Sequence, residues 1–384
     1  MVSLSLANMT NQLVWQRLEG QGNYPSSREG HSFTFCPALN CYLLFGGIGT
    51  QRTNETHTFN VQTSSWKLLE ITGKLPPERN AHVAWVDEIN NALYIHGGQS
   101  AKRDSLADLQ ALSLTSLSWT RIYTSEQQPS GRTHHSLALW AGLAYIFGGM
   151  SGESLLMNDL WTFAYKDVDW SRREPLAPAW VQLLPTGKIP KPRKAHTMVS
   201  YEGDLFVFGG ITAKGHTNDL YQLRTALMEW RQVKSHGTVT PTPRAFHAST
   251  LFLDNYLVVF GGIQSLKDQI MILDDLLLLD LKRMDWAQPF AGGILPSSRY
   301  GHAVATGIAM GREQLVLVGG LNRTYSVMEV YCLEELHLHP GQKWTLQEVR
   351  KAQETAAQAD LTIMINKKLL KELEGQLFAQ RDNA

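Results

Sequence analysis

Residues 193–211, RKAHTMVSYEGDLFVFGGI, combine side chains that could bind an anion or a metal ion. Arg193 lies three residues before His196, and an apolar run then leads to the glycine pair Gly209–Gly210. A cation beside glycine-rich backbone can hold a phosphate, and an imidazole can ligate a metal. The same residues could equally be structural, and a single copy of the pattern does not distinguish the two interpretations.

The rest of the chain does distinguish them, because the pattern occurs six times. The arginine and histidine recur as Arg28/His31, Arg79/His82, Arg132/His135, Arg193/His196, Arg244/His247 and Arg299/His302. A glycine pair begins 16 to 20 residues after each arginine, and a tryptophan lies 13 or 14 residues before it. A catalytic site is not normally copied at a fixed period, whereas a structural unit is. The repetition therefore favours architecture.

Each unit predicts four short β-strands. The second strand is the clearest: YLLF, LYIH, LFVF and LVVF are apolar on both faces, as a strand buried on both sides must be. The two glycines then allow a sharp exit turn. Four-stranded units at a period of about 50 to 60 residues predict an all-β fold, a six-bladed β-propeller. An open sandwich is the alternative, but it does not explain six units in phase.

The order R-x-x-H, apolar strand, GG, third strand and W resembles the kelch repeat, over roughly Trp15 to Leu336. The resemblance implies a kelch propeller that serves as a protein-binding platform. Three features depart from the pattern. His96 replaces the Phe or Val that precedes the other glycine pairs, the third unit has an insertion containing Trp170, and the sixth unit's third strand lacks an Asn/Asp lead.

The tryptophan pattern also predicts how the ring closes. Trp15 has the sequence context of an outer fourth strand but no three strands before it. Residues 13–19 are therefore expected to complete the sixth blade, although Trp344 competes for the same position. This gives an N-terminal segment over 1–12, a propeller over 13–340 and a separate C-terminal segment over 345–380.

The C-terminal segment predicts an amphipathic α-helix. Apolar residues recur seven apart at Val349, Ala356, Ile363, Leu370 and Leu377. Such a heptad seam is typical of a coiled coil that joins two chains or binds a partner helix. A helix packed on the side of the propeller is the other interpretation, and the coiled coil is favoured.

Cations in the loops after the glycine pairs are the candidate binding residues. They are Arg52, Lys102, Arg103, Lys214, Lys267 and Arg323, and only the third loop carries an acid, Glu153, instead. Lys188, Lys191 and Lys194 are expected to join them. The kelch resemblance adds the motif arginines Arg28, Arg79, Arg132, Arg193, Arg244 and Arg299, since residues near the inner strand often reach the binding face. The alternative for these is structural: each histidine bonds backbone, and each arginine pairs with a neighbouring blade's acid.

A positive rim on a chain with 35 basic and 35 acidic residues would suit an acidic or phosphorylated protein segment. The balanced charge argues against a nucleic-acid or membrane partner. Three cysteines form no metal motif or disulfide framework, and no apolar stretch is long enough to span a bilayer, so we expect a cytoplasmic protein without a cofactor or metal.

The expected function is a non-enzymatic adaptor or scaffold. A ubiquitin-ligase substrate receptor is one alternative, but the sequence shows neither an N-terminal dimerisation domain nor a cysteine-containing helix box. A metal-dependent kelch-fold enzyme is the other. Catalytic motifs are missing, because GMSG is not a nucleophile elbow and GKLP lacks the Ser/Thr of a phosphate loop.

Overall fold

The computed structural model describes residues 13–124, 127–165, 179–266, 269–309, 311–323 and 325–335. The predicted segments 1–12 and 345–380, as well as Trp170, Lys267 and Trp344, lie outside the described residues. Within the described residues the chain is almost entirely β-structure with one short 3₁₀ helix, η1 (Pro37–Leu39), and the all-β prediction is confirmed. No described helix is long and apolar enough to cross a membrane.

The described strands form six sheets of four or five strands, here numbered along the chain. Sheet 1 contains β2 (Gln21–Gly22), β3 (Ser32–Cys36), β4 (Cys41–Phe45), β5 (Thr56–Asn60) and β6 (Ser65–Leu68). Sheet 2 contains β8 (Val83–Asp87), β9 (Ala92–His96), β11 (Leu109–Ser113) and β12 (Ser118–Ile122). Sheet 3 contains β13 (Ser136–Trp140), β14 (Leu143–Ser151), β15 (Leu155–Ala164) and β16 (Trp180–Leu183).

The other three large sheets repeat this order. Sheet 4 contains β17 (Thr186–Gly187), β19 (Thr197–Tyr201), β20 (Asp204–Phe208), β23 (Leu220–Arg224) and β24 (Glu229–Val233). Sheet 5 contains β25 (His236–Gly237), β26 (Ala248–Phe252), β27 (Tyr256–Phe260), β30 (Leu276–Asp280) and β31 (Asp285–Ala287). Sheet 6 contains β1 (Leu13–Leu18), β32 (Ala291–Gly293), β33 (Ala303–Ala309), β34 (Arg312–Val318) and β35 (Val330–Glu335).

Smaller ribbons are formed by the loops that follow the glycine pairs, in two cases together with the segment that begins at the motif arginine. They are β7 (Arg79–Asn80) with β10 (Gln99–Ser100), β18 (Arg193–Lys194) with β21 (Ile211–Thr212) and β22 (Gly215–His216), and β28 (Ile263–Leu266) with β29 (Gln269–Ile272).

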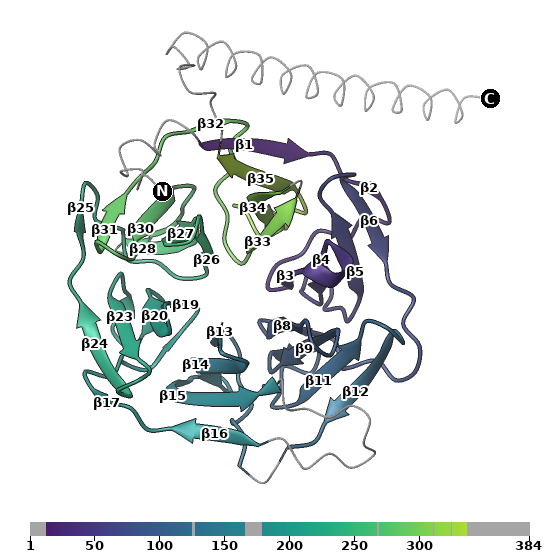
Figure 1. Ribbon diagram of the computed structural model, residues 1–384, viewed down its shortest axis with the longest axis horizontal. Helices are drawn as coiled ribbons and strands as arrows, with labels where there is room; N and C mark the ends of the chain where they lie inside the picture. The colour runs from purple at the N-terminus through teal and green to yellow at the C-terminus, as the bar shows by residue number, and fades with distance from the viewer. Residues whose placement is uncertain are drawn as a thin grey trace, which may run out of the picture.

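The six sheets stand around a common centre, so the arrangement is β-propeller-like (Figure 1). Each inner strand follows the Arg-x-x-His motif, and each outer strand begins at or close to the motif tryptophan. Short strands such as β2 and β17 add a parallel fifth strand beside the outer strand of the next sheet. These strands cover what would otherwise be an unpaired sheet edge.

The N-terminal strand belongs to sheet 6. Strand β1 pairs antiparallel with β35, with Trp15 opposite Leu333. The outer position of the last sheet is therefore occupied by the strand that contains Trp15, and the first and last strands of the described residues lie side by side (Figure 1).

The hydrophobic core lies between neighbouring sheets. Phe45 and Leu43 of sheet 1 cluster with Leu93 and Trp119 of sheet 2, for example, and each of these side chains is at most 8% exposed. A sheet that is apolar on both faces can bury both only between two neighbours. This explains the continuous apolar runs of the second strands.

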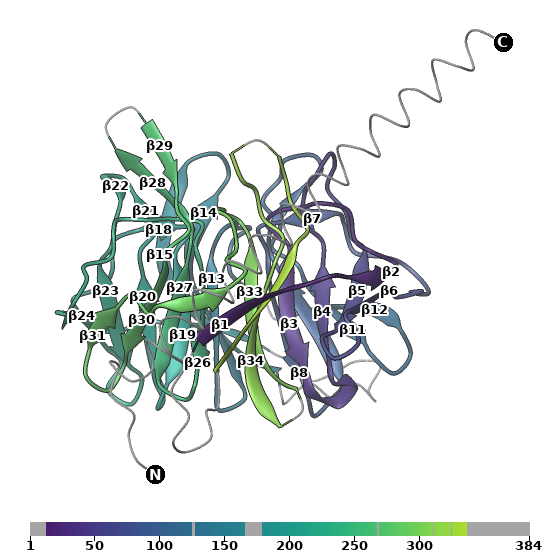
Figure 2. The same cartoon turned by 90° about the horizontal axis from the view of Figure 1, so that it is seen from above.

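The molecule has two distinct faces, separated in Figure 2. The glycine-loop face carries the loops after the glycine pairs, including β21, β22, β28 and β29, together with the motif-arginine strands β7 and β18. The turn face carries the turns between first and second strands, such as η1 in sheet 1 and the turn between β33 and β34 in sheet 6.

Candidate partner-binding face

The six motif arginines are buried, with at most 1% of each side chain exposed. Arg132 shows the arrangement: its Nη1 and Nη2 lie 2.8 Å from Asp159 Oδ1 and Oδ2, its Nη1 donates to the Gly148 carbonyl at 3.0 Å, and its Nε donates to the Ser130 carbonyl. Each arginine pairs with an acid of its own sheet, which lies directly before the third strand in five sheets and within β15 in sheet 3. These acids are Glu55, Asp108, Asp159, Asp219, Asp275 and Glu329.

These contacts correct two expectations. Arg28, Arg79, Arg132, Arg193, Arg244 and Arg299 have no exposed surface for a partner, so they do not belong to the binding rim. They also pair within their own sheet rather than with a neighbouring one. Burial alone would raise the pKa of Asp159, but the hydrogen bonds and charge of Arg132 outweigh it and lower that pKa. In sheet 6, Glu329 supplies the acid although the Asn/Asp lead is missing.

The motif histidines connect neighbouring sheets. The Nε2 atom of His82 lies 3.0 Å from Ser32 Oγ, and that of His196 lies 2.8 Å from Ser136 Oγ. His247 meets Thr197 in the same way. The partners of these three histidines are side-chain hydroxyls on the preceding sheet. Backbone hydrogen bonds from Phe147 and Phe260 also act on His196 and His302, as the structural alternative expected. Burial lowers the pKa of His196 to about 3, so the imidazole stays neutral.

His96 is explained by the same contact. The first residue of β8 is Val83, which has no hydroxyl to offer the next sheet. His96 lies directly opposite Val83 in register, and its Nδ1 lies 3.2 Å from His135 Nε2. The second imidazole therefore replaces the missing hydroxyl, and the residue that broke the sequence pattern has a structural role.

The glycine pairs fit between two histidines. A Cβ added to Gly97 would lie 2.8 Å from His135 of the next sheet, and one added to Gly98 would lie 2.9 Å from His82 of its own sheet. Both glycines have positive φ, at 69° and 97°. Glycine is thus required at both positions, because a Cβ would clash with a histidine and because φ is positive. The role of the pair is structural.

The residues just before the histidines close the centre of the glycine-loop face. All six have positive φ and form a ring in which each backbone N–H donates to the preceding sheet's carbonyl at 2.7–3.0 Å. The ring runs through Gly30, Ala81, His134, Ala195, Phe246 and Gly301 and returns from Gly30 to Gly301. These residues and the histidines line a cavity of about 170 Å³. Within the described chain, no group of three or more His, Cys, Asp or Glu residues could hold a metal ion.

The loop cations lie outside this buried ring, on the glycine-loop face. Lys102, Arg103, Lys214 and Arg323 are exposed. Arg52 is half-buried, donates to Asn80 Oδ1 at 2.8 Å and also bonds Gln99, so it ties sheet 1 to sheet 2. Burial lowers the pKa of Arg52, and the charge of Arg103 lowers it further.

The three linker lysines differ in position. Lys188 follows β17, bonds Gln232 of the outer strand β24, and so lies at the perimeter rather than on the glycine-loop face. Lys194 is on that face, with its Nζ 3.2 Å from Met150 Sδ. Lys191 is exposed in the link between them.

Large apolar side chains share the glycine-loop face with the cations, which the sequence reasoning missed. They are Leu155, Leu266, Ile270, Met271 and Tyr325, each between 47% and 68% exposed. Three of them belong to the β28–β29 hairpin, which projects beyond the other elements (Figure 2). Its loop, residues 263–274, is the longest of those that follow a glycine pair, and that length was the available signal.

The radial sheets, buried ion pairs and exposed loops define a propeller-like protein whose elaborated surface is a loop face. The sequence profile of the KLHDC2/KLHL20/DRC7 Kelch-repeats domain matches residues 34–178 and 176–370. The chain therefore belongs to the kelch-repeat family, whose members generally mediate protein–protein interactions.

Three relatives illustrate the similarity. Acyl-CoA-binding domain-containing protein 4 of Arabidopsis thaliana is 29% identical over 71% of this chain and 39% of its own length. Human Kelch domain-containing protein 3 is 28% identical over 67% of this chain and 68% of its own length. Human Host cell factor 2 is 28% identical over 65% of this chain and 32% of its own length. The similarity thus covers only part of each relative.

Proposed function

We propose that this protein is a non-enzymatic adaptor: a closed six-bladed kelch propeller whose glycine-loop face binds an acidic segment of a partner protein. The observation that carries the proposal is the position of four exposed cations, Lys102, Arg103, Lys214 and Arg323, in loops of three sheets on one face. The loops of the same face also expose the acids Asp104, Glu153 and Asp274, so the cations are separate positive positions rather than a continuous positive rim. Such a surface attracts acidic or phosphorylated segments.

The apolar side chains of the same face refine the partner's chemistry. Ile270 is 68% exposed and Tyr325 is 63% exposed, and burying them would add hydrophobic free energy that charge alone does not supply. A partner segment with carboxylates or phosphates beside apolar residues would use both features. The family's general role in protein–protein interaction supports this assignment over an enzymatic one.

The C-terminal segment 345–380 is the proposed second docking element, serving oligomerisation or the binding of a partner helix. Its heptad seam is apolar, and an isolated amphipathic helix is marginal in water unless that seam is covered. A cytoplasmic location is part of the proposal.

Charge reversal with a matched control tests the proposal. One full-length bait carries Lys102→Glu, Arg103→Glu, Lys214→Glu and Arg323→Glu. The control carries Lys67→Glu, Lys74→Glu, Lys188→Glu and Lys234→Glu, which make the same charge change on exposed side chains away from that face. Quantitative affinity capture should lose partners with the first bait and keep them with the second. Partners retained by the first bait, or lost equally by both, would reject the glycine-loop face as the binding site.

A further inference from the structure

The boundary between sheets 6 and 1 lacks a polar contact that four other boundaries have. At those four, the motif histidine meets a polar side chain of the preceding sheet, as His196 meets Ser136. The corresponding residue for His31 is Ala303, the first residue of β33, which has no hydroxyl. A backbone hydrogen bond from Val318 still acts on His31. Among the described residues, however, no side chain bonds to either nitrogen of that imidazole.

A ring contact that the other five boundaries share is replaced here by an aliphatic one. The residue before the glycine pair is Val318 in sheet 6, whereas it is Phe or His in the other sheets. In each of those sheets this ring lies close to the next motif histidine, as Phe260 lies edge-on to His302 with centroids 5.5 Å apart. Val318 and Trp66 do share a buried apolar cluster, but His31 has no aromatic neighbour across the boundary in the described chain.

The motif ion pairs of sheets 1 and 6 have fewer hydrogen bonds than those of the other four sheets. Arg28 and Arg299 each make one hydrogen bond to a carboxylate, and the acid is a glutamate in both cases. The other four arginines each make two hydrogen bonds to an aspartate. Two parallel bonds fix a guanidinium more firmly than one. The Arg28 carbonyl accepts the backbone N–H of Gly320 at 2.9 Å, so the less firmly fixed arginine carries a contact to sheet 6.

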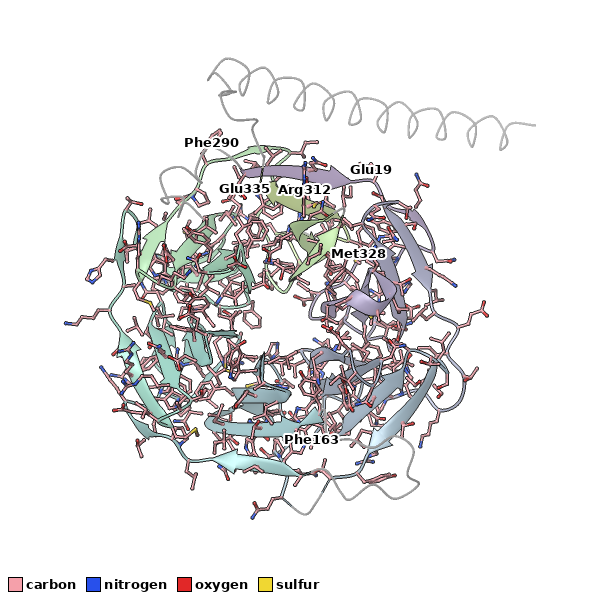
Figure 3. The ribbon with its side chains drawn as sticks, in the orientation of Figure 1. Glu19, Phe163, Phe290, Arg312, Met328 and Glu335 are labelled. Carbon is pink, nitrogen blue, oxygen red and sulfur yellow. The ribbon has the colours of Figure 1, made fainter. Side chains whose placement is uncertain are left out.

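One contact at this boundary is replaced rather than lost. In sheet 3, the Asn158 side chain donates to the Pro190 carbonyl, in the link to sheet 4, at 3.1 Å. Sheet 6 has Met328 at the position of that asparagine, and the Tyr24 hydroxyl of the link donates to the Met328 carbonyl at 2.5 Å. Figure 3 shows Met328 where sheet 6 meets sheet 1.

The turn-face end of the same boundary is closely packed. Gly307 of β33 leaves room for Phe35 and Tyr42 of sheet 1, because a Cβ at Gly307 would lie 2.6 Å from each of these side chains. The missing side-chain contacts therefore lie at the glycine-loop end, around His31.

We infer that the boundary between sheets 6 and 1 is the point at which the ring opens: it separates transiently, from its glycine-loop end, more often than any other boundary. The boundary between sheets 5 and 6 shares the missing hydroxyl, at Ala248, but keeps the ring contact of Phe260. Gly30, His31 and Gly301 line the central cavity, so opening here enlarges it. The inference rests on the closed ring proposed above and not on what the glycine-loop face binds.

Amide hydrogen exchange of the full chain at single-residue resolution tests the inference. The backbone N–H groups of Gly30 and Gly320 both donate across the boundary between sheets 6 and 1. Those of Phe246 and Gly210 make the same two contacts between sheets 4 and 5. After correction for intrinsic exchange rates, Gly30 and Gly320 should be protected about ten-fold less than Phe246 and Gly210, because one hydrogen bond and one ring contact are missing.

Two matched variants show whether the missing hydroxyl contributes. Ala303→Ser offers His31 the hydroxyl that it lacks and should raise the protection of Gly30 and Gly320 by about two- to ten-fold. Ala248→Ser adds the same group at the boundary between sheets 5 and 6, so it should leave the exchange of those two amides unchanged.

The reverse change applies to the boundary between sheets 4 and 5. Thr197→Ala removes the hydroxyl that meets His247 and should lower the protection of Phe246 and Gly210 by a similar factor. Exchange of the second strand of each sheet reports whether the variants are folded.

Three results would overturn the inference. One is equal protection at all the boundaries, and another is an Ala303→Ser variant in which Gly30 and Gly320 exchange as in the wild type. The third is the absence of any protection at Gly30 and Gly320 in the wild type. That result would mean that sheets 6 and 1 are not in contact, and it would contradict the closed ring as well.

Discussion

Trp15 packs edge-on against Phe260, with ring centroids 5.7 Å apart. Trp230 contacts Phe147 at 5.4 Å and Trp286 contacts Phe208 at 5.0 Å. In each case the tryptophan of one outer strand covers the aromatic residue that precedes the glycine pair of the previous sheet. The tryptophan of the N-terminal strand thus makes the same contact with the preceding sheet as the tryptophans of the outer strands β24 and β31.

This contact predicts that Trp15→Ala destabilises the protein by about 3–5 kcal/mol, because a fully buried indole leaves a cavity. Urea unfolding followed by circular dichroism measures the change. Trp344→Ala is the comparison, since Trp344 is the other candidate for the closing strand. If Trp344→Ala lowered the free energy of unfolding more than Trp15→Ala does, the segment with Trp344 and not the strand with Trp15 would close the ring.

The buried ion pairs predict a large effect from a small chemical change. Asp159→Asn leaves the fully buried Arg132 guanidinium without its counter-charge and should cost about 3–5 kcal/mol of unfolding free energy. Glu229→Gln removes the acid of the half-exposed Arg224–Glu229 pair and should cost less than about 1 kcal/mol. Equal costs in chemical denaturation would show that the motif arginines are not the structural anchors described here.

The buried histidines predict that the free energy of unfolding falls with decreasing pH before the carboxylates of the buried ion pairs become protonated. Burial lowers the pKa of His31 and of His196 from 6.5 to about 3. Between these values the unfolded chain binds protons that the folded chain does not, so the free energy of unfolding decreases as pH falls below 6.5. His196→Gln should reduce the slope near pH 5 by about 1.4 kcal/mol per pH unit. An unchanged slope would mean that this imidazole is already charged in the folded protein.

The repeated strands could be predicted from sequence because each copy carries the same local signals. An apolar run, two glycines and a tryptophan recur in phase, so an ambiguous strand in one unit can be assigned by alignment with the other five. The position of Trp15 followed from the same logic, and β1 lies beside β35.

Contacts between side chains could not be predicted in this way. The arginines looked like rim cations because their partners, such as Asp159, lie 27 positions later and meet them only in the folded sheet. An acid at a similar distance after every arginine was the missed signal. His96 looked like an exception because its role depends on Val83, which lies opposite it in the sheet. Exposure of residues such as Ile270 depends on how far a hairpin projects, which a local pattern does not encode.

In the proposed propeller, six copies of one structural unit close into a single ring through the N-terminal strand. Gln16 lies directly opposite the buried free thiol of Cys332. With an added oxidant, the variant Gln16→Cys should therefore form an intramolecular disulfide between positions 16 and 332, identified in the monomer by mass spectrometry of the linked peptides. A folded Gln16→Cys protein that never forms this link would contradict the closed ring.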